Sequence, residues 1–256
     1  MTDRLVKLAD GFWSVRGEFR IGLLDIGTQC ALVRLADGDF VFLDSYTLSD
    51  SIMDEVDAII GDRSKVRAIL NVHPFHTIHC EWMHNAFPEA DLYGTARHLK
   101  KFPELPWQDV QCEESAMAER FGDDFAFSVP RGVPLVSDDE SVHFSSVLVF
   151  HRASGTIHVD DTFNYLRKGF PLSLLPITGR LDFHMTLGKA LEPRAGAADE
   201  FRDWAINLGI EWADAKRLAS AHNAVFSFDK VAFPNMLGEA LGRVKPVLDR
   251  HPSKYG

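Results

Sequence analysis

The chain has 256 residues, of which 46% are hydrophobic and 25% are charged, as in an ordinary globular protein. This length predicts a single domain over residues 1–256 with a full hydrophobic core. The formal net charge of −10 disfavours binding to phosphate backbones, so no nucleic-acid partner is expected.

No apolar run approaches the ~20 residues needed to cross a bilayer, and the first residues carry no apolar signal region. We therefore expect no membrane partner and a cytoplasmic location. The three cysteines form no C-x-x-C pair, and an odd number argues against a disulfide framework. The oligomeric state stays open, a homo-oligomer included.

The N-terminal region has the pattern of a β-meander followed by a helix. Residues 28–35 and 40–43 are apolar runs joined by Asp37-Gly38, a strong hairpin signal. Apolar residues then recur at helical spacing across 52–60, and Gly61 is suited to end that helix.

The next elements alternate between strand and helix. Residues 66–72 are an apolar run typical of a buried strand, and the pattern predicts a short helix over 82–87 and a strand over 91–94. Residues 100–135 are rich in Pro, Phe and acidic residues, which favours loops with short elements.

The C-terminal half returns to clear signals. The predicted elements are a hairpin of strands 146–150 and 156–159, a helix over 201–208 stopped by Gly209, a strand over 218–221 and a helix from Pro234 to about 248. This order favours an α/β protein with two sheets over a single doubly wound sheet.

Three of the 11 histidines, His73, His76 and His79, fall within seven residues directly after the predicted strand 66–72. Imidazoles are the commonest transition-metal ligands, and a loop leaving a buried strand provides a rigid base for a site. The cluster therefore predicts metal ligands. The alternative is a solvated His-rich turn.

Other candidate ligands also lie beside apolar runs. Asp44, Asp161 and His222 follow such runs, and His143 precedes one. Each has an ordinary structural alternative, as a turn residue, a helix cap or a half-buried polar group. Asp160 and Asp161 are adjacent, so in a strand they would point to opposite faces and at most one would face a metal.

The joint order of these residues resembles the metallo-β-lactamase superfamily. That series has an Asp after an early strand, then H-x-H-x-D-H after a buried strand, then a His, an Asp at a strand end and a final His. The segments similar to it span roughly residues 12 to 225 and are 42–45, 69–73, 141–146, 159–163 and 218–223.

The resemblance implies a four-layer αββα sandwich, with two mixed sheets flanked by helices. It also implies one or two divalent metal ions at one edge of the sheets, with zinc the first expectation and iron or manganese the alternatives. The expected ligands are His73, His76, His79, His143, Asp161 and His222. Asp161, expected to bridge or balance the charge of the metal, is also the candidate catalytic residue.

The chain departs from the superfamily in the second motif. Counted from His73, the second His falls on Phe75, the Asp on Thr77 and the last His on Ile78. Residues 76–90 resemble a branch in which a His is followed by Glu-Trp, a helix and a Pro-containing turn. If residues 76–79 are helical, His76 and His79 share one face and take over ligand roles.

The function implied is that of a metal-dependent hydrolase acting on a small ester, lactone, amide or phosphoester. A metal held by imidazoles and a carboxylate activates water for such chemistry. Two alternatives stay open. One is a non-catalytic metal- or ligand-binding protein, because the motif Asp is missing, and the other is a non-heme iron oxidoreductase.

The remaining histidines are expected to have ordinary roles. His158 lies inside a predicted strand and is expected to pack or to form a hydrogen bond. His184 is either on the substrate side or an ordinary His. Surface positions are expected for His84, His98, His151 and His251.

Overall fold

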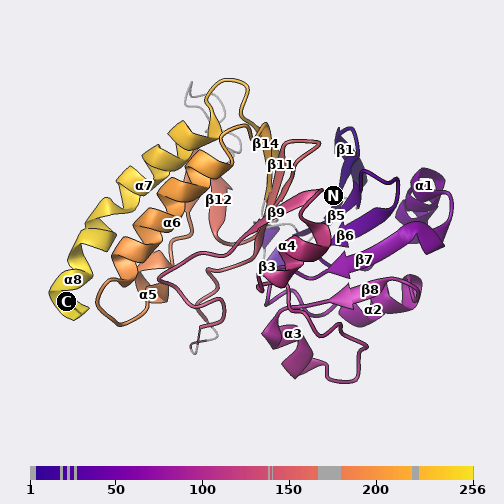
Figure 1. The fold of residues 1–256 in the computed structure, drawn as a ribbon, viewed down its shortest axis with the longest axis horizontal. Helices are drawn as coiled ribbons and strands as arrows, with labels where there is room; N and C mark the ends of the chain where they lie inside the picture. The colour runs from indigo at the N-terminus through magenta and orange to yellow at the C-terminus, as the bar shows by residue number, and fades with distance from the viewer. Residues whose placement is uncertain are drawn as a thin grey trace.

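The computed structural model describes residues 4–17, 20–21, 24–25, 28–137, 139, 141–166, 180–220 and 225–255. Most strands fall into two sheets (Figure 1). The six-stranded sheet has the order β1 (Arg4–Ala9), β2 (Phe12–Gly17), β5 (Thr28–Arg34), β6 (Phe40–Leu43), β7 (Val66–Leu70), β8 (Asp91–Tyr93). The five-stranded sheet has the order β15 (Val225–Ser227), β14 (Arg217–Ser220), β11 (Thr156–Val159), β10 (Leu148–His151), β9 (Phe125–Ser128).

Both sheets are mixed, and the parallel pairs decide where the candidate site forms. Strands β6, β7 and β8 run parallel, and β11 runs parallel to β14, whereas the other neighbours are antiparallel. Parallel neighbours deliver their carboxyl ends to one edge of a sheet. Two short hairpins complete the strands, β3 (Arg20–Ile21) with β4 (Leu24–Asp25) and β12 (Phe163–Leu166) with β13 (Arg180–Phe183).

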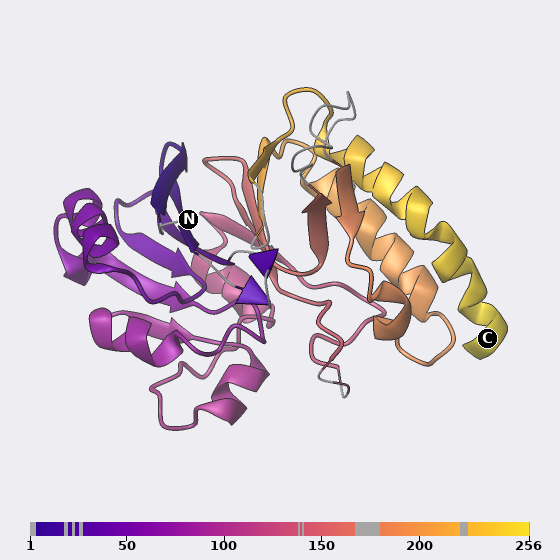
Figure 2. The same cartoon turned by 180° about the vertical axis from the view of Figure 1, so that it is seen from behind.

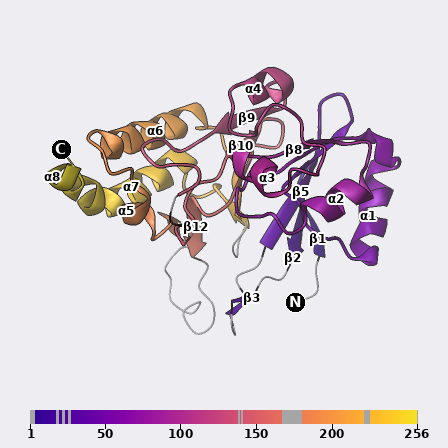
Figure 3. The same cartoon turned by 90° about the horizontal axis from the view of Figure 1, so that it is seen from below.

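The helices flank the pair of sheets on both outer sides. On the side of the six-stranded sheet are α1 (Asp50–Ile60), α2 (Cys80–Ala86) and α3 (Ala96–Lys101), which follows β8. On the other side are α6 (Ala197–Glu211) and α7 (Phe233–Arg250), with the β12–β13 hairpin against them when seen from behind (Figure 2). The view from below shows the same two helical flanks (Figure 3). The shorter helices are a 3-10 turn at Arg63–Lys65, α4 (Ala116–Phe121), α5 (Leu187–Ala190) and α8 (Pro252–Tyr255).

Alternation along the strands produces three separate cores. On β5, Leu32 packs with α1 and its neighbours, whereas Val33 faces the space between the sheets. On β10, Val149 faces the other sheet and Phe150 joins the core beneath α6 and α7. Because successive strand residues point to opposite faces, both sheets are buried on two sides. The expected four-layer αββα sandwich is confirmed.

The predicted elements agree with the observed ones in type and differ mainly in their ends. Helix α1 ends before Gly61, whose φ of 74° suits glycine. Helix α6, expected to stop at Gly209, continues to Glu211. Gly209 therefore lies inside α6, on the side that packs against Pro234 and Leu237 of α7.

The surface positions expected for four histidines are wrong. His98 is fully buried in the capping box of α3, and His151 is 1% exposed with Nδ1 2.9 Å from Ser154 Oγ. His251 is buried with Nε2 2.9 Å from a backbone carbonyl, and His84 is half-buried. Within the described ranges, no helix is long and apolar enough to span a membrane.

Candidate metal centre

Three strand ends meet at one edge of the sandwich. Asp44 directly follows β6, His73 lies just beyond β7, and Asp160 directly follows β11. The backbone joins the two sheets here, because the N–H of Val147 donates to the carbonyl of Val72 at 3.0 Å. Polar side chains from distant parts of the sequence therefore converge at a buried position.

The imidazole of His73 is oriented from both ring nitrogens. Its Nδ1 accepts a hydrogen bond from the backbone N–H of Phe75 at 3.3 Å, and its Nε2 lies 2.8 Å from Asp161 Oδ2. Because Nδ1 acts as the acceptor, Nε2 carries the proton that Asp161 accepts. His73 is 1% exposed, so its ring is held within the protein.

His76 lies beside His73 because the loop turns back after β7. The His76 N–H donates to the His73 carbonyl at 3.1 Å, and the ring centroids are 4.1 Å apart. Nδ1 of His76 lies 2.9 Å from Asp160 Oδ2. Burial alone would lower the pKa of His76, but the charges of Asp160, Asp44 and Asp161 and the bond to Asp160 raise it to about 9.

Asp160 and Asp161 both contact histidines of the site, Asp160 at His76 and Asp161 at His73. Strand β11 ends at Val159, and Asp161 has a φ of 44°, in the left-handed region. Strand alternation therefore no longer applies, and Asp tolerates this backbone better than most residues. Asp160 is also held by its carbonyl, which accepts a hydrogen bond from Ser146 Oγ at 2.7 Å.

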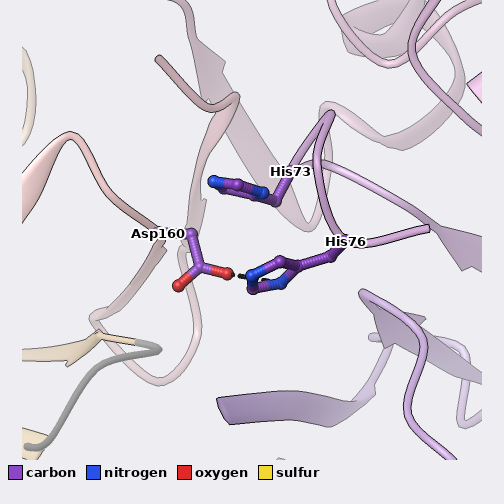
Figure 4. A group of neighbouring side chains, drawn as sticks. All are labelled: His73, His76 and Asp160. Atoms are coloured by element: carbon purple, nitrogen blue, oxygen red, sulfur yellow. Dashed lines mark ion pairs between the residues drawn. The ribbon is translucent and has the colours of Figure 1, made fainter. Parts of the chain in front are cut away.

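His73, His76 and Asp160 have the geometry expected of metal ligands (Figure 4). One donor atom from each lies within 4.8 Å of the others. Donors of one tetrahedral site with bonds of about 2.1 Å lie roughly 3.4 Å apart, so small side-chain movements suffice. The Asp160 side chain is fully buried, and among the described residues its Oδ1 has no hydrogen-bond partner. A buried carboxylate oxygen of this kind fits a cation.

The other expected ligands that the structure describes are not part of this group. Nδ1 of His79 lies 2.9 Å from Thr47 Oγ1 and its ring is 5.0 Å from that of Tyr46. Burial and then the charge of His76 lower the pKa of His79. His143 is exposed and stacks on Phe75 at 3.9 Å. Asp161 contacts the group through His73, and His222 lies outside the described residues.

The expectation of a shared helical face does not apply to His76 and His79, because α2 begins only at Cys80. The position of the missing motif Asp holds Thr77, which is 2% exposed and accepts a hydrogen bond from Lys101 Nζ at 2.7 Å. Cys80 is also buried, and burial raises the pKa of its thiol to about 12. Its Sγ lies 3.4 Å from Asn71 Oδ1 and is not part of the group of His73, His76 and Asp160.

Sequence reasoning missed two residues of the site. Asp160 was set aside in favour of Asp161, and the only available signal was that the two are adjacent. His158 was expected to pack or to form a hydrogen bond. It does bond to Asp44 at 2.8 Å, but nothing local indicated this partner.

No protein-family profile and no curated protein matches the sequence. Solved structures match the fold over nearly the whole chain. DIM-1 metallo-β-lactamase has a TM-score of 0.58 at 12% identity, with 96% of this chain and 97% of that one covered. A metallo-β-lactamase from Pontibacter korlensis has a TM-score of 0.59 at 9% identity, covering 95% and 99%.

A third similar structure is FIM-1 from Pseudomonas aeruginosa in its mono-zinc form, with a TM-score of 0.56 at 9% identity and coverage of 94% and 96%. At such low identity the agreement concerns the path of the chain and not the substrate. With the layer order and the sheet topology described above, it identifies this chain as having the metallo-β-lactamase fold.

Proposed function

We propose that the protein is a metal-dependent hydrolase acting on a small ester, lactone, amide or phosphoester. One observation carries the proposal: two imidazoles and a fully buried carboxylate converge at the edge of a metallo-β-lactamase fold. Two His and one carboxylate form a known ligand set of catalytic zinc, which leaves coordination positions open.

The chain's own residues would divide the work between holding and orienting. His73, His76 and Asp160 would hold the ion, which when bound activates water and polarises a carbonyl or phosphoryl oxygen. Asp161 accepts the proton of His73 Nε2 and fixes the direction of that ring, so Nδ1, which accepts the Phe75 N–H at 3.3 Å, would be the nitrogen available to the ion. Metal binding must displace the proton from His76, so tighter binding is expected as the pH rises.

The same donor set favours a second candidate, a non-heme iron oxidoreductase. Two His and one carboxylate are also the ligand pattern of many iron oxygenases. Metal identity separates the two candidates. A third, a non-catalytic binding protein, draws support from the buried Thr77, which provides no carboxylate at the motif position.

Elemental analysis of protein purified without chelator or added metal tests the proposal. We expect about one or two equivalents of zinc or manganese in the wild type, and loss of that metal in His76→Ala and Asp160→Asn. Asp139→Asn is the matched control, because Asp139 is exposed and its described side-chain hydrogen bonds are to Ser141 in the same loop.

A panel of esters, lactones, amides and phosphoesters then tests turnover by the loaded wild type. Iron and a coloured protein would favour the oxidoreductase. Metal-loaded protein that is inactive across the whole panel would contradict the hydrolase proposal and support a binding role.

A further inference from the structure

We propose that His158 is a positioning residue that fixes His73 through Asp44. The inference concerns the metal centre proposed above and rests on that proposal for its functional meaning. The structural link that it describes exists in the chain with or without a metal.

Asp44 follows β6 and forms hydrogen bonds to residues that follow β7 and to a residue of β11. Its Oδ1 accepts hydrogen bonds from the backbone N–H groups of Val72 at 2.9 Å and His73 at 3.1 Å. Its Oδ2 lies 2.8 Å from His158 Nε2. Because His158 lies on β11 of the opposite sheet, the bond spans the sandwich and reaches the backbone that carries the His73 ring.

The other contacts of Asp44 fix the direction of this bond. Its Oδ1 accepts from two backbone N–H groups, as a carboxylate oxygen does. With Oδ2 as the acceptor, His158 Nε2 is the donor. Among the described residues, Nδ1 of His158 has no hydrogen-bond partner, so the bond to Asp44 is the hydrogen bond that this buried ring makes.

The backbone of Asp44 depends on these contacts. Its φ of 61° lies in the left-handed region, which costs free energy in a non-glycine residue. Three hydrogen bonds hold the carboxylate where it can receive the two N–H groups. Without His158 as a partner, Asp44 would keep a buried, partly unsatisfied charge and is expected to move, taking the turn at His73 with it.

A purely structural role is the alternative, because His158 is fully buried in the sandwich. The chain provides a matched control in His151, which is buried in the neighbouring strand β10 and bonds to Ser154. Replacing either residue perturbs the core of the same sheet. Only the change at His158 should alter the metal centre.

The test compares His158→Leu, His158→Gln and His151→Leu with the wild type. Zinc affinity is measured by competition with a chromophoric chelator, and site geometry by the visible spectrum of the cobalt(II)-substituted protein. Loss of a group that orients a ligand typically weakens metal binding about 10–100-fold. We expect that loss and an altered cobalt spectrum in His158→Leu.

His158→Gln is expected to restore affinity to within about threefold, because the Gln amide nitrogen can replace His Nε2 as the donor to Asp44. His151→Leu should leave affinity and spectrum unchanged. If His158→Leu does not fold, His158→Asn carries the same prediction, because its amide is too short to reach Asp44.

Unchanged affinity in His158→Leu, or a loss that His158→Gln does not rescue, overturns the inference. If the wild type binds no metal, the proposed function fails, and amide hydrogen exchange at Val72 and His73 decides the inference instead. Faster exchange in His158→Leu but not in His158→Gln supports the positioning role, and equal exchange in all three proteins overturns it.

Discussion

The loop after β7 and the corner after β11 reach the same site by different means. The loop contributes imidazoles, and backbone hydrogen bonds within the loop hold them, such as the one from Phe75 to His73 Nδ1. The corner contributes carboxylates, and a left-handed Asp161 directs them. The loop has a local sequence signature, whereas the corner depends on contacts from elsewhere, such as Ser146.

The difference shows how a buried polar site divides its charge between two sheets. One side supplies groups that can be positive and the other supplies groups that are negative, so neither side is stable in a dry interior alone. The pairs His73–Asp161 and His76–Asp160 each cross the boundary between the two sides. Changes on one side should therefore be felt on the other.

The largest effect is expected at Asp44, which anchors the loop side. Asp44→Ala leaves two backbone N–H groups and His158 without their acceptor, each at a cost of about 1–3 kcal/mol. We expect the free energy of unfolding to fall by about 4 kcal/mol in denaturant titrations. The control Asp139→Ala should change it by less than about 0.5 kcal/mol. A small effect of Asp44→Ala would mean that the hydrogen bonds within the loop after β7 keep its conformation without Asp44.

The two carboxylates of the corner should differ from one another. Asp160→Asn removes a direct donor and should weaken zinc binding by about 100-fold or more, whereas Asp161→Asn removes only the group that orients His73 and should cost about tenfold. Chelator competition measures both. A larger loss of zinc affinity in Asp161→Asn than in Asp160→Asn would indicate that Asp161 is the direct ligand, as the resemblance to the metallo-β-lactamases implies.

Two histidines of the loop after β7 should also differ in their effect on metal binding. His76→Ala removes a direct donor and should lower zinc affinity by about 100-fold or more, as for Asp160→Asn. His79→Ala should change it by less than about threefold, because His79 faces Thr47 and Tyr46. Equal losses in the two variants would show that the loop rearranges when it binds metal.

The smallest effect is expected at His151, which lies outside both the loop after β7 and the corner after β11, and it concerns the pH dependence of stability. Burial lowers its pKa to about 4, although the charge of Asp124 opposes the shift. The unfolded chain, with a pKa near 6.5, binds the proton more readily, so stability present above pH 6.5 is lost as the pH falls toward 4. The loss between pH 7.5 and 5.5 should be about 1 kcal/mol.

His151→Phe should remove this loss, because its neighbours Phe12 and Phe125 are aromatic and accommodate a ring. Denaturant titrations at the two pH values measure it. A parallel loss in wild type and variant would assign acid sensitivity to other groups.

The outer parts of the fold were predictable because their signals are local. Asp37-Gly38 predicted the β5–β6 hairpin, and apolar spacing with Gly61 predicted α1 and its end. Gly209 misled because a glycine commonly ends a helix, whereas α6 continues to Glu211. In this stretch α6 packs against α7, which lies more than 20 residues further along the chain.

The sequence by itself indicated an α/β protein with two sheets and a His-rich loop, because hydrophobic periodicity and residue type act within a few residues. The four-layer αββα class was what the resemblance to the metallo-β-lactamase superfamily implied. Only the tertiary structure decided that Asp160 joins His73 and His76, and that His158 meets Asp44 across 114 positions. A left-handed corner and a bond between two sheets exist only once the sheets are packed, because both need distant groups to offset strain and buried charge.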